Sequence, residues 1–438
     1  MDFLLDKISR YLDELRKYMY DCEEELYDWK IKDCGYKPSG DILPVVDDSW
    51  RDFKKGDRWG TGLDSHCWFY KKFTVPEHPE GKRVLLYFNV DSPNAQIDNN
   101  PQLIVYVNGR IAHGIDHNHR FVALSGKEQE VFIYAYTGVW KGEHPLVSEL
   151  VVKNEEIEKL YYNLFIPREC LKKMRENTTE YVDVLRRIDD AMNIVDFTVP
   201  RSESFYSSVA EANRFLDERF YGEICRDSGI HCVCIGHTHI DVAWLWTLAQ
   251  TREKAVRSFS NVVDMMEEYP EYKFMSSQPQ LYKYVKEDSP ETYEKIKKFV
   301  KEGRWEPEGA MWVEADCNLT SGESLVRQIL FGKRFFRDEF GVESRVLWLP
   351  DVFGYSAAIP QILRKSGVDK FVTSKIGWNE YNTMPYDSFW WYGIDGTEVF
   401  TWFLTAQDLP DDGKWETSTG YNANLTPSQV KGTWARYQ

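Results

Sequence analysis

Residues 231–246 read HCVCIGHTHIDVAWLW. The apolar run at 233–235 predicts a short buried strand, which delivers His237, His239 and Asp241 at every second position. Alternation in an extended chain places these three side chains on one face. Two imidazoles and a carboxylate that converge in this way are typical of a divalent metal site such as a zinc site. We therefore expect a metal at the C-terminal end of this strand, and histidines that only cap or hydrogen-bond are the alternative.

The chain after residue 231 alternates between strand-like and helix-like patterns. The strand-like runs are at 232–235, 272–276, 309–313, 346–349 and 370–374, and the helix-like runs are at 252–268, 291–301, 323–340 and 357–366. This alternation predicts a parallel sheet with crossover helices, either open or closed into a barrel. Such sheets carry their sites at the C-terminal ends of the strands, where His239 and Asp241 lie. Asp351 follows the fourth strand, so we expect it to point toward the same site.

The whole chain is predicted to be multidomain. Its parts are an N-terminal helical segment at 1–40, a β-sandwich at 41–153, a helical linker at 154–228 and a catalytic α/β domain at 229–438. An amphipathic pattern in the first 19 residues predicts one helix, and a second short helix is expected near 23–30. The sandwich rests on several short strand-like runs with turns between them, of which Asn108-Gly109 is the strongest hairpin signal.

The composition argues against several classes of partner. A net charge of -16 and a pI near 5.2 would repel nucleic acid and anionic membranes, and no basic stripe offsets this charge. The eight cysteines contain no CxxC pair, so neither a zinc ribbon nor a disulfide framework is predicted. Charges interrupt the apolar positions of the first 19 residues, which argues against a signal peptide or a membrane span. We expect a cytoplasmic protein.

Two other groups of residues are less specific. His113, His117 and His119 lie close together, but their polar, loop-like setting favours solvated histidines over a metal site. Tryptophans are frequent after residue 231, and most are expected in the core because large apolar area is what cores need. Trp244, three residues past Asp241, is the exception that we expect to face a substrate.

Three motifs carry a resemblance to a known family. They are GHTHIDVAWLW at 236–246, GAMWVEADCN at 309–318 and WLPDVFGYSAAIPQIL at 348–363. In this order and spacing they resemble glycoside hydrolase family 38, the metal-dependent α-mannosidases, and most closely its cytosolic and bacterial branch. The resemblance covers residues 231–438 directly. It implies a seven-stranded β/α barrel as the catalytic domain and a mannose-containing oligosaccharide as substrate, and enzymes of this branch are often oligomeric.

The resemblance also implies roles for single residues. His239 and Asp241 would bind one Zn²⁺ per chain, or another divalent ion in its place. Asp351 would both contact the zinc and act as the nucleophile of a retaining hydrolysis through a covalent mannosyl-enzyme. His237 is expected beside this set, where it would orient a ligand.

Three further residues are expected to contact the sugar. Trp244 and Phe353 would line the mannose subsite. Lys375 lies where another branch of the family has an arginine. The resemblance therefore implies its contact with substrate less directly than those of Trp244 and Phe353.

Two groups that the resemblance implies have no match in the sequence. The fourth zinc ligand, a histidine, and the general acid/base, an aspartate in a glycine-rich segment, are expected past Gln438. Residues 231–438 are also fewer than the about 250 residues that an eight-stranded barrel typically takes. A helix start at Thr426-Pro427 comes shortly before the last residue. We therefore expect a fragment, with Glu308, Glu314 and Asp316 as weaker candidates for the acid.

Two alternative functions remain open at this point. One is another metal-dependent hydrolase, such as an amidohydrolase-like barrel, although no histidine follows His239. A metallo-β-lactamase-like site is disfavoured because Val242 stands where that motif has a histidine. The other alternative is a chain that only binds sugar, through Trp59, Trp68 and Trp140 of the predicted sandwich.

Overall fold

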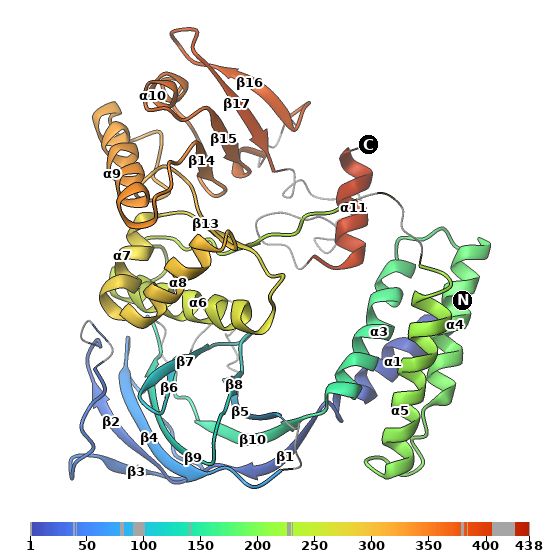
Figure 1. Cartoon of the computed structure of the whole chain (residues 1–438). Coiled ribbons are helices and arrows are strands. Elements are labelled where there is room, and N and C mark those ends of the chain that lie inside the picture. Colours follow the sequence, from blue (N-terminus) through green and yellow to red (C-terminus); the bar gives the residue numbers. More distant parts are fainter. Residues whose placement is uncertain are drawn as a thin grey trace.

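The computed structural model of this chain describes residues 2–37, 40, 42–78, 83–90, 101–139, 142–225, 229, 231–377, 381–382, 384–404 and 425–437. These residues form a β-sandwich, a helical bundle at its side, and a third part of parallel strands and helices that lies above the sandwich in Figure 1. No helix among them is both long and apolar enough to cross a membrane.

The sandwich consists of two antiparallel sheets that share one core. One sheet has the order β1 (Tyr20–Glu25), β10 (Val147–Lys153), β5 (Arg83–Asn89), β8 (Phe121–Ala123). The other has the order β3 (Arg51–Phe53), β2 (Trp29–Cys34), β4 (His66–Thr74), β9 (Glu128–Tyr136), β6 (Gln102–Val107), β7 (Arg110–Ile115). Phe69, Leu86 and Ile133 are fully buried between the sheets. The predicted hairpin at Asn108-Gly109 is confirmed, because β6 and β7 pair across it and both residues have positive φ.

The segment after the first helix is extended, so the predicted helix near 23–30 is wrong. β1 pairs with β10, and β2 pairs with β3 and β4, which brings residues 20–34 into the sandwich. In β2, Trp29 and Ile31 are buried while Lys30 is exposed, which is the period of a half-buried strand. In so short a run, the helical period is hard to distinguish from this alternation.

Four helices pack around a second core beside the sandwich: α1 (Asp2–Arg16), α3 (Glu155–Leu171), α4 (Thr179–Ile194) and α5 (Glu203–Leu216). A π-helical turn, η1 (Asp217–Tyr221), continues α5. The predicted helix start at Thr426-Pro427 is confirmed by α11 (Pro427–Tyr437), which lies against α3 (Figure 1). There Ser428 Oγ donates a hydrogen bond to Glu169 Oε2 at 3.3 Å, which joins the end of the chain to the bundle.

The third part contains six parallel strands in the order in which the chain reaches them. β11 (Gly236–His237), β12 (Phe274–Ser276) and β13 (Trp305–Pro307) form one sheet. A second sheet contains β14 (Val346–Leu349), β15 (Lys370–Thr373) and β17 (Glu398–Phe403), with antiparallel β16 (Ser388–Tyr392) at its edge. A bridge between Gly309 and Leu347 joins the two sheets. The helices of this part are α6 (Leu248–Glu268), α7 (Pro279–Asp288), α8 (Pro290–Lys301), α9 (Gly322–Phe340), α10 (Ile359–Lys365) and the 3-10 turn η2 (Lys375–Gly377).

Two predicted strands of this part need correction. The run at 232–235 is not a strand, and Val233 is 79% exposed, because no described strand pairs with it. The strand predicted at 309–313 lies earlier, at β13, because Gly309 and Ala310 both have positive φ and end the extended backbone.

Helix α6 lies across β7 and links the sandwich to the third part (Figure 1). Asn261 hydrogen-bonds both backbone groups of Gly114, at 2.7 and 2.9 Å. The Arg257 side chain covers the same glycine so closely that a Cβ there would lie 1.7 Å from Arg257 Cγ. His113 Nδ1 lies 2.8 Å from Asp264 of α6, so this histidine is held at the interface rather than solvated as predicted.

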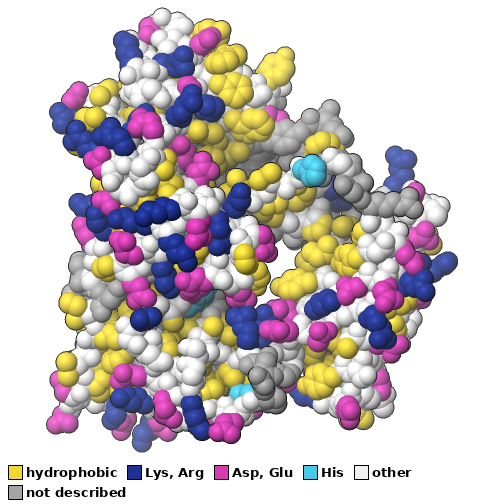
Figure 2. Space-filling model, viewed as in Figure 1, with side chains coloured by type: hydrophobic (Ala, Val, Ile, Leu, Met, Phe, Trp, Pro, Cys, Tyr) yellow, Lys and Arg dark blue, Asp and Glu magenta, His cyan; other side chains and the backbone are white. Residues whose placement is uncertain are grey.

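The charged side chains are mixed on the face of the molecule that Figure 2 shows. Lys and Arg side chains alternate with Asp and Glu over the sandwich, the bundle and the third part. Hydrophobic side chains gather near the top of this view, where β16 and β17 lie. On this face the described residues therefore present no basic stripe of the kind that binds nucleic acid.

Glu253 of α6 makes the stability of this interface depend on pH. Its Oε1 accepts a hydrogen bond from Tyr134 Oη of the sandwich at 2.6 Å, and burial raises its pKa from 4.5 to about 8. Because the folded-state pKa is the higher one, the unfolded chain binds fewer protons between these values, and stability falls as pH rises. We expect Glu253→Gln, which keeps the shape and the acceptor, to be more stable than the parent by roughly a few kcal/mol at pH 8.

At pH 5 this difference should shrink, because Glu253 is then protonated in the fold. Denaturant unfolding of both chains at pH 5 and pH 8 measures it, with Glu128→Gln, a change at the exposed first residue of β9, as the control. A difference that does not change with pH would show that Glu253 ionises normally in the folded chain.

Candidate metal and active site

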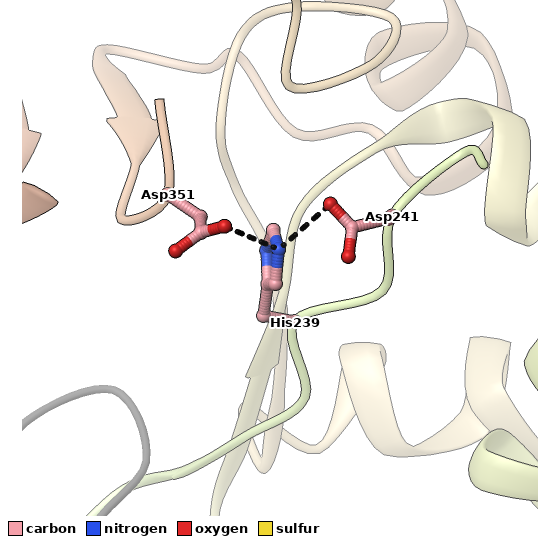
Figure 3. Close-up of side chains that lie close together, drawn as sticks. All are labelled: His239, Asp241 and Asp351. Atoms are coloured by element: carbon pink, nitrogen blue, oxygen red, sulfur yellow. Dashed lines mark ion pairs between the residues drawn. The ribbon is translucent and has the colours of Figure 1, made fainter. Parts of the chain in front are cut away.

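Three acidic or imidazole side chains from distant segments converge at one edge of the parallel strands. His239 and Asp241 follow β11, and Asp351 follows β14. His239 Nε2 lies 3.4 Å from Asp241 Oδ1 and 3.6 Å from Asp351 Oδ2 (Figure 3). The ligand atoms of the three residues lie within 4.8 Å of one another, and no other group of this kind is present among the described residues.

Hydrogen bonds to the backbone hold the two loops that carry these residues. Gln278 Nε2 donates to Ile240 O at 2.9 Å, and Trp246 Nε1 donates to Asp241 O at 3.2 Å. In the other loop, Tyr355 Oη donates to Val352 O at 2.6 Å. These hydrogen bonds therefore hold in place the backbone that carries His239, Asp241 and Asp351.

Negative charge exceeds positive charge around His239. Its Nδ1 lies 2.8 Å from Glu314 Oε2, so three carboxylates surround one ring. Burial alone would lower the pKa of His239, but its contacts with Asp241 and Glu314 raise that pKa to about 10. Lys375 Nζ donates to Asp351 Oδ1 at 2.8 Å and supplies one further positive charge. An imidazole nitrogen beside two carboxylate oxygens is a donor set that suits Zn²⁺, so these residues fit a divalent metal.

His237 lies in β11 and makes different contacts from His239. Its Nδ1 lies 3.0 Å from Met275 O, and its Nε2 accepts a hydrogen bond from Trp348 Nε1 at 3.2 Å. Burial lowers the pKa of His237, which favours the neutral ring that these two contacts require. Its hydrogen bonds therefore go to a strand backbone and a tryptophan, and its orienting role stays a prediction.

The residues expected to contact a sugar lie on loops at the same edge. Trp244 follows β11 and is 65% exposed, and Phe353 follows β14 and is 73% exposed. Lys375 begins η2 directly after β15 and is held by Asp351. Large aromatic side chains exposed beside carboxylates are available for a ligand.

The three carboxylates considered as acids are already engaged. Glu308 Oε1 accepts from Gly309 N at 2.9 Å, and burial raises its pKa. Asp316 Oδ1 accepts from the backbone of Asn318 and Leu319. The pairing of Glu314 with His239 was not predicted, although the place of Glu314 after the third strand of a parallel sheet is a signal for it.

The two described tryptophans of the sugar-binding alternative are buried. Trp68 of β4 and Trp59, which lies outside the named strands, are buried in two different cores, and Trp140 lies outside the described residues. The two described side chains therefore contribute to packing, which leaves no observation in favour of a sugar site on the sandwich.

Comparison with known proteins gives one family and several relatives. Residues 229–438 match the glycosyl hydrolases family 38 N-terminal domain. Alpha-mannosidase G of Dictyostelium discoideum is 40% identical over 259 residues, which are 59% of this chain and 23% of that protein. Alpha-mannosidase of Saccharomyces cerevisiae is 31% identical over 371 residues (79% and 33%), and human Alpha-mannosidase 2C1 is 33% identical over 397 residues (85% and 37%). The chain spans less than two fifths of the length of each of these curated relatives.

Proposed function

Residues 229–438 belong to the glycosyl hydrolase family 38 N-terminal domain family, and on this premise we propose that the chain is the metal-binding and nucleophile-bearing part of a retaining α-mannosidase. The observation that carries the proposal is the position of Asp351, whose carboxylate faces His239 although the two are far apart in the sequence. The names of the relatives, all α-mannosidases, support α-linked mannose as the substrate class, and we propose terminal mannose of an oligosaccharide.

His239, Asp241 and Asp351 would hold one divalent ion, with Zn²⁺ as the first expectation. When bound, the ion would supply positive charge to sugar hydroxyls and so help to orient the ring. The excess of carboxylates around His239 supports this assignment, because a cation would offset it.

Asp351 would act as the nucleophile. Its carboxylate oxygen attacks the anomeric carbon while the bond to the glycosidic oxygen breaks, and a second carboxyl group protonates that leaving oxygen. Water activated by the same group then cleaves the mannosyl ester and restores Asp351. Lys375, at 2.8 Å from Asp351 Oδ1, would hold the carboxylate in place. We assign the second carboxyl to none of Glu308, Glu314 and Asp316, since each already has partners.

Trp244 and Phe353 would pack against the apolar face of the bound mannose. Truncation of either side chain to alanine should raise KM about three- to tenfold, because each loses one aromatic contact, with a smaller change in kcat. Steady-state kinetics on an aryl α-mannoside measures this. Tyr162→Ala, which removes an exposed aromatic from α3 of the bundle, is the control. Unchanged KM in both variants would place the mannose subsite elsewhere.

A cytoplasmic setting is part of the proposal. All eight cysteines are free, which supports a reducing compartment.

Zinc content measured together with hydrolysis of an aryl α-mannoside tests the function. We expect about one Zn²⁺ per chain and hydrolysis with retained configuration by the protein that contains these residues. A protein with neither metal nor hydrolysis would overturn the proposal, and hydrolysis of an amide or ester substrate would favour the alternative hydrolase.

A further inference from the structure

Glu314 is a buried carboxylate on the far side of the His239 ring from the other two acids. Its side chain is only 5% exposed. Oε2 lies 2.8 Å from His239 Nδ1, and Oε1 accepts a hydrogen bond from Ser277 Oγ at 2.6 Å. Oε1 is therefore held by a hydrogen bond, and Oε2 lies within ion-pair distance of the His239 ring.

The neighbour of Nδ1 helps to decide which nitrogen of the ring can bind a metal. A neutral imidazole has one N–H donor and one acceptor nitrogen, and a carboxylate can only accept. When Nε2 gives its lone pair to a bound metal, the remaining proton of the ring is on Nδ1, and Glu314 would accept from it there. Nε2 faces Asp241 Oδ1 at 3.4 Å and Asp351 Oδ2 at 3.6 Å.

The loop after β12 holds this arrangement together. Gln278 Oε1 accepts from the backbone N–H of Glu314 at 3.1 Å, while its Nε2 donates to Ile240 O at 2.9 Å. Gln278 thus connects the segment of Glu314 to the residue next to His239. Ser277 packs so close to Gly309 that a Cβ at that glycine would lie 2.7 Å from Ser277 Cβ. The loops after three successive strands are therefore linked around one histidine.

We propose that Glu314 is a positioning residue of the metal site, which fixes the orientation and the Nδ1–H form of His239 so that Nε2 can bind the metal. Ser277 and Gln278 hold Glu314 in place for this role. The proposal rests on the proposed function only in that a metal binds at His239, Asp241 and Asp351. Because the ring separates Glu314 from the two other carboxylates, Glu314 acts through His239 and contacts neither metal nor sugar.

Zinc affinity of matched variants, measured by competition with a chelator, tests this role. Glu314→Ala should weaken zinc binding by about ten- to a hundredfold, as is typical when the partner of a ligating histidine is lost. Glu314→Gln should recover most of the affinity, because the amide oxygen can accept from Nδ1–H and the amide nitrogen can donate to Ser277 Oγ. Asp316→Ala is the control, since Asp316 lies two residues away on the same loop and its carboxylate accepts hydrogen bonds from the backbone of Asn318 and Leu319.

Unfolding of the metal-free variants separates positioning from a general loss of structure. A Glu314→Ala chain that is folded but binds zinc weakly, with rescue by glutamine, supports the proposal. A Glu314→Ala chain that is less stable yet binds zinc as tightly as the parent overturns it and leaves the metal site intact. If the parent and Asp316→Ala both fail to bind zinc, the metal site of the proposed function is itself wrong, and the role of Glu314 falls with it.

Discussion

Asp351→Asn is expected to lower the hydrolysis of an aryl α-mannoside by about four orders of magnitude or more, the scale seen when a nucleophile is removed. The amide lacks the negative charge of the carboxylate, so its oxygen is a far weaker nucleophile toward the anomeric carbon. It keeps the size of the side chain, and its oxygen can still accept from Lys375 Nζ, which now lies 2.8 Å from Oδ1. The fold should therefore be retained, and kcat at saturating zinc is the quantity to measure.

The control for this prediction is Asp316→Asn, which makes the same chemical change on an exposed carboxylate of the same part of the fold. Its kcat should stay within about twofold of the parent value, because typical surface changes away from a site have little effect. Zinc content is measured in both variants, so that loss of the metal is not mistaken for loss of the nucleophile. Retained turnover by a zinc-loaded Asp351→Asn protein would remove Asp351 from the nucleophile role.

Elements whose pattern is local could be predicted from the sequence. The predicted runs at 346–349 and 323–340 agree within one residue with β14 and α9. In both cases the pattern lies entirely within one element. It is a period of 3.6 residues in the helix and a short apolar run in the strand. The run at 232–235 has an equally good pattern, but a strand also needs a neighbour to pair with, and pairing is not encoded in the run itself. The segment at 23–30 is the converse case. Its own pattern favours a helix, but it is extended because it pairs with strands that lie far along the chain.

The same distinction applies to the candidate site. The convergence of His239, Asp241 and Asp351 could be predicted, because the C-terminal ends of parallel strands meet at one edge. Their roles remain predictions. The pairing of Glu314 with His239 could not be predicted, because it depends on the orientation of one ring and on the contacts of Ser277 and Gln278. Orientation of this kind is set by packing in three dimensions rather than by spacing along the chain.

His239→Ala is expected to weaken zinc binding by on the order of a hundredfold or more, because it removes the only imidazole of the three-residue donor set. It also leaves Glu314 buried without the ring that now pairs with it at 2.8 Å, so the metal-free chain should lose stability as well. Chelator competition measures the affinity, and metal content after dialysis gives an independent reading.

His237→Gln is the matched control, since it changes the other histidine of the same motif. A glutamine at this position can donate to Met275 O and accept from Trp348 Nε1, the two contacts that His237 now makes at 3.0 and 3.2 Å. We therefore expect zinc affinity within about tenfold of the parent, the mild end of what a change beside a metal ligand costs. Equal and large losses in both variants would make His237 a ligand as well, against its present contacts. Unchanged affinity in His239→Ala would mean that the metal is bound elsewhere. Without the nitrogen ligand, the carboxylates of Asp241 and Asp351 should bind Zn²⁺ far more weakly.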